Sequence, residues 1–72
     1  MKILITGCNG QLGNEMQLLE MLHPEHTYFN TDVQALDLPG RLPQQVLDIT
    51  DQEAIEAFVD EHGIDGIVNC AA

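Results

Sequence analysis

Positive charge is almost absent from this chain. Lys2 and Arg41 are the only lysine and arginine among 72 residues, against twelve aspartates and glutamates, and the formal net charge is −10 at pH 7. Nucleic-acid binding needs several cations to neutralise backbone phosphates, so the composition argues against a nucleic-acid partner. The excess of acidic residues is most simply a solvated surface.

Cysteines and long apolar runs are scarce too. Cys8 and Cys70 are the only cysteines, and their spacing suits neither a Cys-x-x-Cys redox pair nor a four-ligand zinc site. We therefore expect free thiols, no metal and a reducing compartment. The first apolar run, Ile3–Ile5, is too short for a signal peptide or a membrane span. These absences favour a soluble, cytoplasmic protein without a membrane partner, and the short chain allows at most one small domain.

What the chain does have is an alternation of strand-like and helical patterns. These patterns predict strands at residues 2–6, 27–31, 45–49 and 64–70, and helices at residues 11–22 and about 51–62. After the second strand, Pro39-Gly40 and Pro43 are breakers, so we expect no helix there beyond one short turn at residues 33–36. Strands that alternate with helices indicate an α/β fold with a parallel sheet.

Both helices carry local signals. Leu12, Met16 and Leu19 fall on one face of the first helix and predict its apolar side. The second helix is preceded by Thr50–Glu53, which matches a capping box, and Gly63 is well placed to end it.

Right-handed crossovers limit how such a sheet can wind. We expect a Rossmann-like sheet of four strands in the spatial order 3-2-1-4, with two main helices. The gap between strands 1 and 4 is then the topological switch point, where open α/β sheets bind ligands. The loop after strand 1 and the end of strand 4 should face each other across such a ligand.

The turn after the first strand carries the most specific motif. Gly7, Gly10 and Gly13 are spaced three apart between an expected strand and an expected helix. Glycine has no Cβ, so backbone N–H groups can approach a phosphate there, and the positive end of the helix points at the same place. The motif predicts a dinucleotide-pyrophosphate site, although a glycine triplet can also be only a set of turns. The same turn adds three candidate residues, Asn9, Gln11 and Leu12.

Asp32 follows Gly13 by 19 residues and lies at the end of the second strand. A carboxylate there can accept hydrogen bonds from ribose hydroxyls and would repel a 2′-phosphate, which favours NAD(H) over NADP(H). The alternative is that Asp32 is a turn residue. Arg41, in the following loop, could meet a 2′-phosphate or face solvent.

Two other strand ends add candidates. Asp48 and Ile49 close the third strand, where they can flank an adenine, although Asp48 could instead only precede the helix cap. Asn69, Ala71 and Ala72 suit close approach of the ribose and nicotinamide, although small residues here could simply pack. The predicted cofactor-binding residues are Gly7, Asn9, Gly10, Gln11, Leu12, Gly13, Asp32, Asp48, Ile49, Ala71 and Ala72.

No catalytic set is visible in the sequence. His23, His26 and His62 are scattered on helix ends and a loop, and we interpret them as surface residues. The ligand predicted from the glycine motif is a dinucleotide, and we expect this chain to supply neither catalytic residues nor a metal site.

The motifs resemble those of the extended short-chain dehydrogenase/reductase superfamily. Its fingerprint, Thr-Gly-x-x-Gly-x-x-Gly, matches Thr6–Gly13. Within it, the dTDP-4-dehydrorhamnose reductase family is the most similar, because Lys2–Gly13, Leu47–Asp51 and Val68–Ala72 match three of its strings in the right order. The segment 33–44 departs from the family because it is longer than its usual link.

The resemblance implies the N-terminal part of an NAD(P)-binding Rossmann domain, with NADPH or NADH as cofactor. Members are about four times longer, and their catalytic Tyr-x-x-x-Lys pair and their substrate part lie downstream. Tyr28 and Lys2, the only tyrosine and lysine, cannot form that pair. By resemblance, the whole protein would reduce a dTDP-4-keto sugar in dTDP-L-rhamnose biosynthesis, and the 72-residue piece itself would not be catalytic.

Two other functions remain open. The chain could be a non-catalytic dinucleotide-sensing module, or part of a related nucleotide-sugar epimerase or dehydratase. In a truncated piece, strand 4 would be an unpaired sheet edge where a fifth strand belongs, and such edges recruit other chains. We therefore expect self-association of the isolated piece, and we also expect a homo-oligomer.

Overall fold

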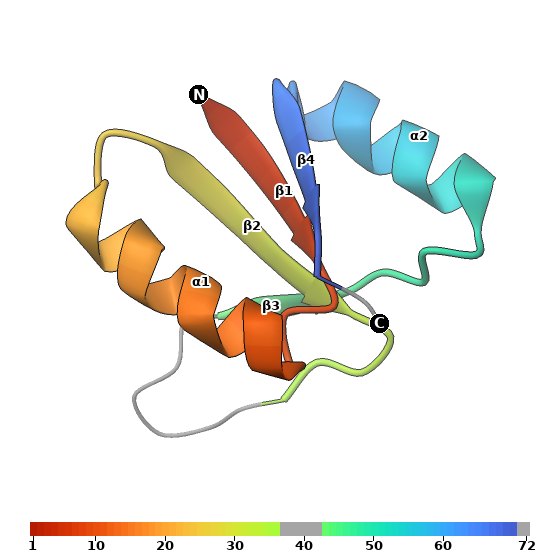
Figure 1. Cartoon of the computed structure of the whole chain (residues 1–72). Helices are drawn as coiled ribbons and strands as arrows, with labels where there is room; N and C mark the ends of the chain where they lie inside the picture. The colour runs from red at the N-terminus through yellow and green to blue at the C-terminus, as the bar shows by residue number, and fades with distance from the viewer. Residues whose placement is uncertain (37–42, 71–72) are drawn as a thin grey trace.

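The computed structural model describes residues 1–36 and 43–70 (Figure 1). The positions with sequence predictions that lie outside these residues are Pro39, Gly40, Arg41, Ala71 and Ala72. In chain order, the elements are β1 (Lys2–Thr6), α1 (Gln11–Leu22), β2 (Thr27–Asp32), β3 (Gln44–Val46), α2 (Gln52–His62) and β4 (Gly66–Asn69). None of the helices in these two ranges is long and apolar enough to cross a membrane.

The four strands form one parallel sheet in the order β3-β2-β1-β4, which confirms the predicted topology. Thr6 at the end of β1 is paired with Thr31 of β2 and Asn69 of β4, so three carboxyl ends meet at one end of the sheet. β1 is central, and its Leu4 and Ile5 are fully buried. A continuous apolar strand is what a parallel sheet covered on both faces requires.

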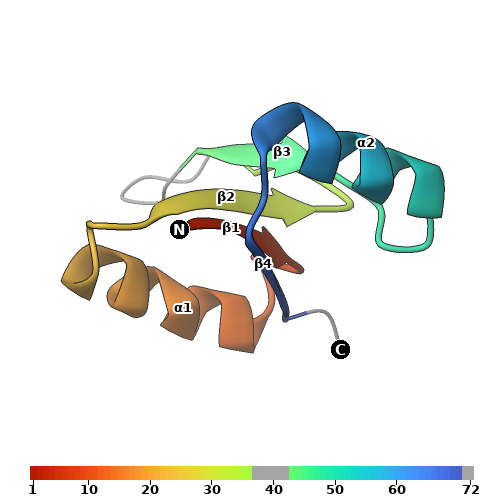
Figure 2. The same cartoon turned by 90° about the horizontal axis from the view of Figure 1, so that it is seen from above.

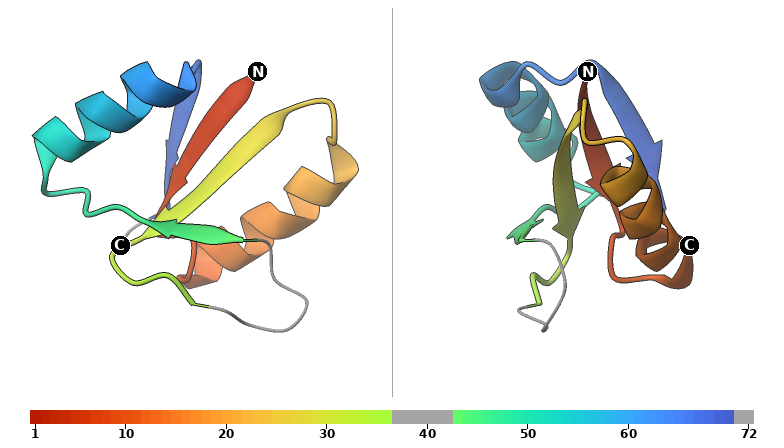
Figure 3. Two further views of the ribbon diagram at one scale, coloured as in Figure 1. Left: turned by 180° about the vertical axis from the view of Figure 1, so that it is seen from behind. Right: turned by 90° about the vertical axis from the view of Figure 1, so that its left-hand side faces the viewer.

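One helix covers each face of this sheet (Figure 2). Because successive strand residues point to opposite faces, Leu4 packs with Phe58 of α2, and Ile5 packs with Met16 of α1. The right-hand view of Figure 3 shows the two helices on opposite sides of the strands. The result is a three-layer, Rossmann-like α/β arrangement.

The core on the α2 side is aromatic. Phe29 and Phe58 meet edge-to-face with ring centroids 5.7 Å apart, and the His62 ring lies 4.3 Å from Phe58 and 4.8 Å from Phe29. The interpretation of His62 as a surface residue is therefore wrong, since it is half-buried against two aromatic rings.

The predicted apolar face of α1 does not face the sheet as a whole. Met16 packs inward, but Leu12 and Leu19 are 52% and 47% exposed. The buried residues of α1 are Gly13 and Glu20, which lie two turns apart on the same side as Met16. Close packing of Gly13 against the sheet sets the rotation of the helix, and this packing overrides the leucine periodicity.

Two strands are shorter than predicted. The first is β3, whose partner strand β2 ends at Asp32. The Asp32 carbonyl still accepts the Leu47 N–H at 2.8 Å, and β3 therefore ends before Asp48 and Ile49. The Ile64 N–H donates to the Val59 carbonyl and so belongs to the end of α2, which delays β4. At the edge strand β4, Ile67 is 55% exposed, and self-association through this edge stays a prediction.

The start of α2 differs from the predicted capping box. The Asp51 carboxylate accepts the Ala54 N–H at 3.1 Å and caps the helix. The Thr50 hydroxyl instead donates to Asp48 Oδ1 at 2.7 Å. At the other end, Gly63 adopts φ 64° and confirms the predicted C-cap.

This assignment predicts which residue stabilises α2. Asp51→Ala should lower the free energy of unfolding by about 1 kcal/mol, because it removes the side-chain acceptor at the N-cap. Thr50→Ala, the matched control, should cost less than about 0.5 kcal/mol, as is usual for an exposed position. Urea denaturation followed by circular dichroism measures the free energy of unfolding of both variants. A larger decrease for Thr50→Ala than for Asp51→Ala would contradict the Asp51 cap and favour the capping box.

Under α1, a carboxyl group is buried against the sheet. Glu20 is 4% exposed, and its Oε1 accepts the Asn30 Nδ2–H at 2.8 Å. Within the described residues, Glu20 Oε2 and Asn30 Oδ1 have no hydrogen-bond partner. Burial raises the pKa of the Glu20 carboxyl, and the Asn30 hydrogen bond offsets this only in part. A protonated carboxyl has an O–H to donate, whereas the ionised form leaves only acceptors.

The raised pKa predicts how stability depends on pH. Below the ordinary Glu20 value of 4.5, the carboxyl is protonated in both folded and unfolded chains, and its contribution is lost as pH rises through the higher folded-state pKa. Glu20→Gln removes this titration and can donate to Asn30. At pH 7 it should be about 1 kcal/mol more stable than the wild type, and the difference should shrink at pH 4. Urea titrations across this range test it; a variant that is less stable at pH 7 would contradict it.

Candidate functional site

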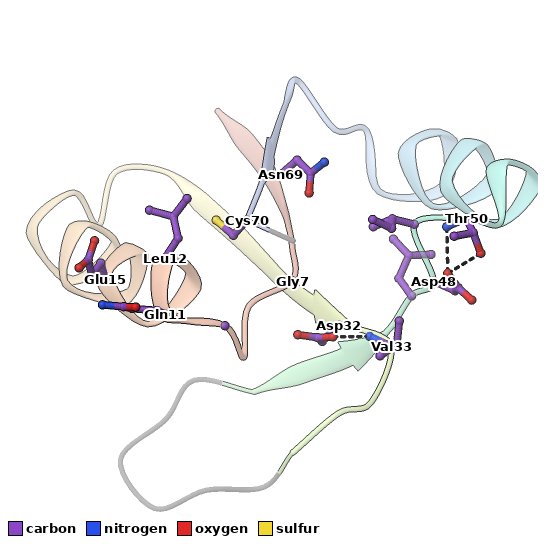
Figure 4. Close-up of a pocket in the computed structure, with 13 residues that line it drawn as sticks. Gly7, Gln11, Leu12, Glu15, Asp32, Val33, Asp48, Thr50, Asn69 and Cys70 are labelled. Carbon is purple, nitrogen blue, oxygen red and sulfur yellow. Dashed lines mark hydrogen bonds between the residues drawn. The ribbon is translucent and has the colours of Figure 1, made fainter. Parts of the chain in front are cut away.

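A cleft of about 800 Å³ opens at the carboxyl ends of β1, β2 and β4 (Figure 4). It includes the predicted switch point between β1 and β4 and extends to the segment that leads from β3 into α2. The lining residues are Gly7, Gly10, Gln11, Leu12, Glu15, Asp32, Val33, Leu47, Asp48, Ile49, Thr50, Asn69 and Cys70.

The glycine loop, residues 7–13, brings the N-terminus of α1 to this cleft. Gly7 has φ 71°, a left-handed conformation that glycine adopts without strain. Gly10 is the N-cap of α1, and no side-chain hydrogen bond caps this helix end. The first N–H groups of α1, at Gln11 and Leu12, can therefore bind an anion, whereas the start of α2 is capped by its own Asp51.

Gly13 has a different role from the other two glycines. A Cβ at this position would lie 2.5 Å from the Cys8 carbonyl oxygen and 2.6 Å from the Cys8 carbonyl carbon. Both are backbone atoms, so the helix could not accommodate a side chain without moving away from β1. At Gly10, a Cβ would meet nothing closer than the Gly7 oxygen at 3.5 Å, which is ordinary van der Waals contact.

Asp32 connects the glycine loop to β2. Its Oδ2 accepts the Asn9 N–H at 3.0 Å, and its Oδ1 accepts the Val33 N–H at 2.7 Å. Each carboxylate oxygen can accept more than one hydrogen bond, so Asp32 keeps capacity for hydroxyl groups in the cleft that it lines. The sequence predicted contact with a ribose but gave no sign that this carboxylate also holds the loop.

The other predicted carboxylate, Asp48, lies across the cleft. Its Oδ1 accepts both the Thr50 N–H at 2.9 Å and the Thr50 hydroxyl at 2.7 Å. These bonds lower the pKa of the Asp48 carboxyl, so it is ionised at neutral pH. Asp48 is thus the helix-preceding turn residue that the alternative interpretation described, and it also lines the cleft beside Ile49.

Charge in the cleft is one-sided. Glu15, Asp32 and Asp48 line it, and no lysine, arginine or histidine is among its lining residues. The amide N–H groups at the start of α1 are thus its source of positive potential within the described residues. In the same part of the chain, no cluster of three or more histidine, cysteine or acidic residues is placed to hold a metal ion.

The end of β4 completes the wall. The Thr6 hydroxyl donates to Asn69 Oδ1 at 3.1 Å, and the Cys70 N–H donates to the Thr6 carbonyl at 2.8 Å. Burial raises the pKa of the Cys70 thiol, with a smaller contribution from Glu20, so the sulfur is neutral. Cys8 and Cys70 lie in one buried cluster, and neither is part of a disulfide.

The structure brings most predicted site residues together, but not all. Asn9 and Gly13 belong to the glycine loop but do not line the cleft, and binding by any of the predicted residues stays a prediction. Sequence reasoning missed Glu15, which lies one helical turn after Gln11 on the same face, so its spacing was a usable signal. It also missed four lining residues that only the fold brings here, Val33, Leu47, Thr50 and Cys70.

The two glycine roles predict opposite results for one substitution. Gly13→Ala should destabilise the fold by more than about 3 kcal/mol, because its Cβ overlaps backbone rather than a movable side chain. Gly10→Ala should cost under about 1 kcal/mol, since its Cβ has room. Thermal unfolding of both variants measures this, and equal destabilisation would contradict the packing role of Gly13.

A comparison with protein families gives one match over the whole chain. The family described as "RmlD substrate binding domain" matches residues 1–72. A curated relative, a probable low-salt glycan biosynthesis reductase of Haloferax volcanii, is 35% identical over 74 aligned residues. The alignment covers 100% of this chain and 23% of that protein.

Solved structures with the same fold include two L-threonine dehydrogenases. A GalE-like enzyme from Cupriavidus necator, in its holo form, superposes with a TM-score of 0.83 at 32% identity over 100% of this chain and 24% of its own. A partial-consensus L-threonine 3-dehydrogenase gives 0.86 at 34% identity, again with 24% of its chain covered. The chain thus spans about a quarter of the length of these relatives.

Proposed function

Because this chain belongs to the RmlD substrate-binding domain family of extended short-chain dehydrogenases/reductases, we propose that its cleft binds the diphosphate and adenosine of a nicotinamide dinucleotide. The observation that carries the proposal is the uncapped N-terminus of α1, behind a glycine loop and open to the cleft. We also propose that residues 1–72 are the N-terminal part of an NAD(P)-binding Rossmann domain.

The diphosphate fits the glycine loop. Its negative charge would meet the amide N–H groups of Gln11 and Leu12 and the positive end of the helix. The absence of a side chain at Gly10 leaves the backbone open to close approach. This binding needs no basic side chain, which is why a chain of net charge −10 can hold an anionic ligand.

The adenosine fits the other half of the cleft. The Asp32 carboxylate would accept ribose hydroxyls, and Asp48 and Ile49 would flank the adenine. A 2′-phosphate would add charge of about −1.5 to −2 beside the anionic cleft side chains. We therefore propose NAD(H) rather than NADP(H) as the preferred cofactor.

For the parent protein, we propose a reductase that acts on a carbonyl of a nucleotide-linked sugar, with a dTDP-4-keto sugar as the specific candidate. The bound cofactor would supply a hydride, and residues beyond this chain would supply the proton. Residues 1–72 would contribute binding and orientation of the cofactor, because the described cleft offers backbone N–H groups and carboxylates but no tyrosine–lysine pair. The name of the Haloferax volcanii relative, a glycan biosynthesis reductase, supports this substrate class.

Calorimetric titration of the 72-residue chain tests the binding proposal. NADH should bind more tightly than NADPH by about tenfold or more, because the second ligand carries an extra phosphate into an acidic cleft. Leu12→Glu should weaken NADH binding by a similar factor, since its carboxylate would stand beside the diphosphate.

Leu18→Glu is the matched control. Leu18 lies on the same helix, is 65% exposed and does not line the cleft, so this variant should bind NADH as the wild type does. Equal loss in both variants would point to a general charge effect, and no loss at Leu12→Glu would contradict the diphosphate site.

A further inference from the structure

Beside the cleft, a pair of amide side chains joins the glycine loop to the first residue of β3. Asn9 Nδ2 donates to Gln44 Oε1 at 2.9 Å, and Gln44 Nε2 donates back to Asn9 Oδ1 at 2.7 Å. The side-chain amide of Asn9 also donates to the Gln34 carbonyl at 2.9 Å, and Gln44 Oε1 accepts the Leu36 N–H at 2.9 Å. One side-chain pair therefore connects three segments that are distant in sequence.

The loop needs such a connection because of its composition. Two glycines, Gly7 and Gly10, flank Asn9 closely, and glycine loses more conformational freedom on ordering than any other residue. A site made of backbone N–H groups binds tightly only if those groups already point at the ligand. The Asn9 N–H itself is donated to Asp32, so the side chain and backbone of Asn9 are held from two directions.

We propose that Gln44 is a positioning residue of the dinucleotide site: it fixes Asn9, and through Asn9 it fixes the backbone amides that receive the diphosphate. This inference rests on the proposed function. Gln44 and Asn9 do not line the cleft, so Gln44 acts without touching the ligand. Gln44 also accepts the Leu36 N–H, so it ties the glycine loop to the segment that follows β2.

A double-mutant cycle separates this role from simple packing. Gln44→Met keeps the size of the side chain but removes the donor and the acceptor. Asn9→Ala removes the other half of the pair. Each single variant should weaken NADH binding by about tenfold, the equivalent of one or two hydrogen bonds, and the double variant should lose little more than either one. Additive losses would overturn the proposal.

The matched control is Gln45→Met, the next residue of the same strand, which is exposed. It should bind NADH like the wild type. Binding of adenosine, which has no phosphate, should be unchanged in all variants, whereas a merely structural defect would weaken both ligands together. Wild-type NADH affinity in Gln44→Met would overturn the proposal.

Hydrogen exchange in the free chain gives a readout that needs no ligand. The backbone N–H of Asn9 should exchange about tenfold faster in Gln44→Met than in the wild type or in Gln45→Met. The exchange rates of the backbone N–H groups of β1 should not change. An unchanged exchange rate at Asn9 would overturn the proposed positioning role of Gln44. If the wild type binds no NADH, the proposed function fails, and the exchange result still decides whether Gln44 holds the loop.

Discussion

The close approach of α1 to β1 at Gly13 is the constraint on which the rest of the structure depends. The backbone of Cys8 occupies the space of a Cβ at position 13, so the helix starts directly against the strand that precedes it. That contact sets the rotation of α1, which turns Glu20 toward the sheet and leaves Leu12 partly exposed. It also holds the helix N-terminus at the carboxyl end of the sheet, where the cleft lies.

In the proposed dinucleotide site on this scaffold, backbone groups would bind the anion, and side chains hold the backbone. Asp32 accepts the Asn9 N–H, and Gln44 pairs with the Asn9 side chain, so two strands other than β1 hold the loop that follows β1. The Asp32 carboxylate also lines the cleft, which couples the shape of the loop to the part of the cleft proposed for the ribose. An acidic protein can bind a diphosphate in this way because the N–H groups at a helix N-terminus supply positive potential without a lysine or arginine side chain.

Several elements could be predicted from local sequence because their causes are local. Lys2–Thr6 and Gln11–Leu22 have the predicted bounds, and Gly63 ends α2, since apolar periodicity and glycine act over a few residues. The errors arose where one contact competes with another signal. Asp51 replaced the predicted cap because Thr50 bonds Asp48, two residues before it, which is a competition between two local signals. His62 is half-buried because the aromatic side chains of β2 and α2 meet there, which is a contact between distant segments.

For the cleft, the sequence by itself determined the glycine loop, the carboxylate at the end of β2 and the strand order that brings them together. These follow from glycine geometry, strand alternation and the handedness of crossovers, which are the same in any chain. Only the tertiary structure decided that Asn9 faces Gln44 rather than the cleft, and that Thr50 and Cys70 line the cleft. Such contacts join residues up to 35 positions apart, and no local pattern encodes which side chains will meet once the sheet has formed.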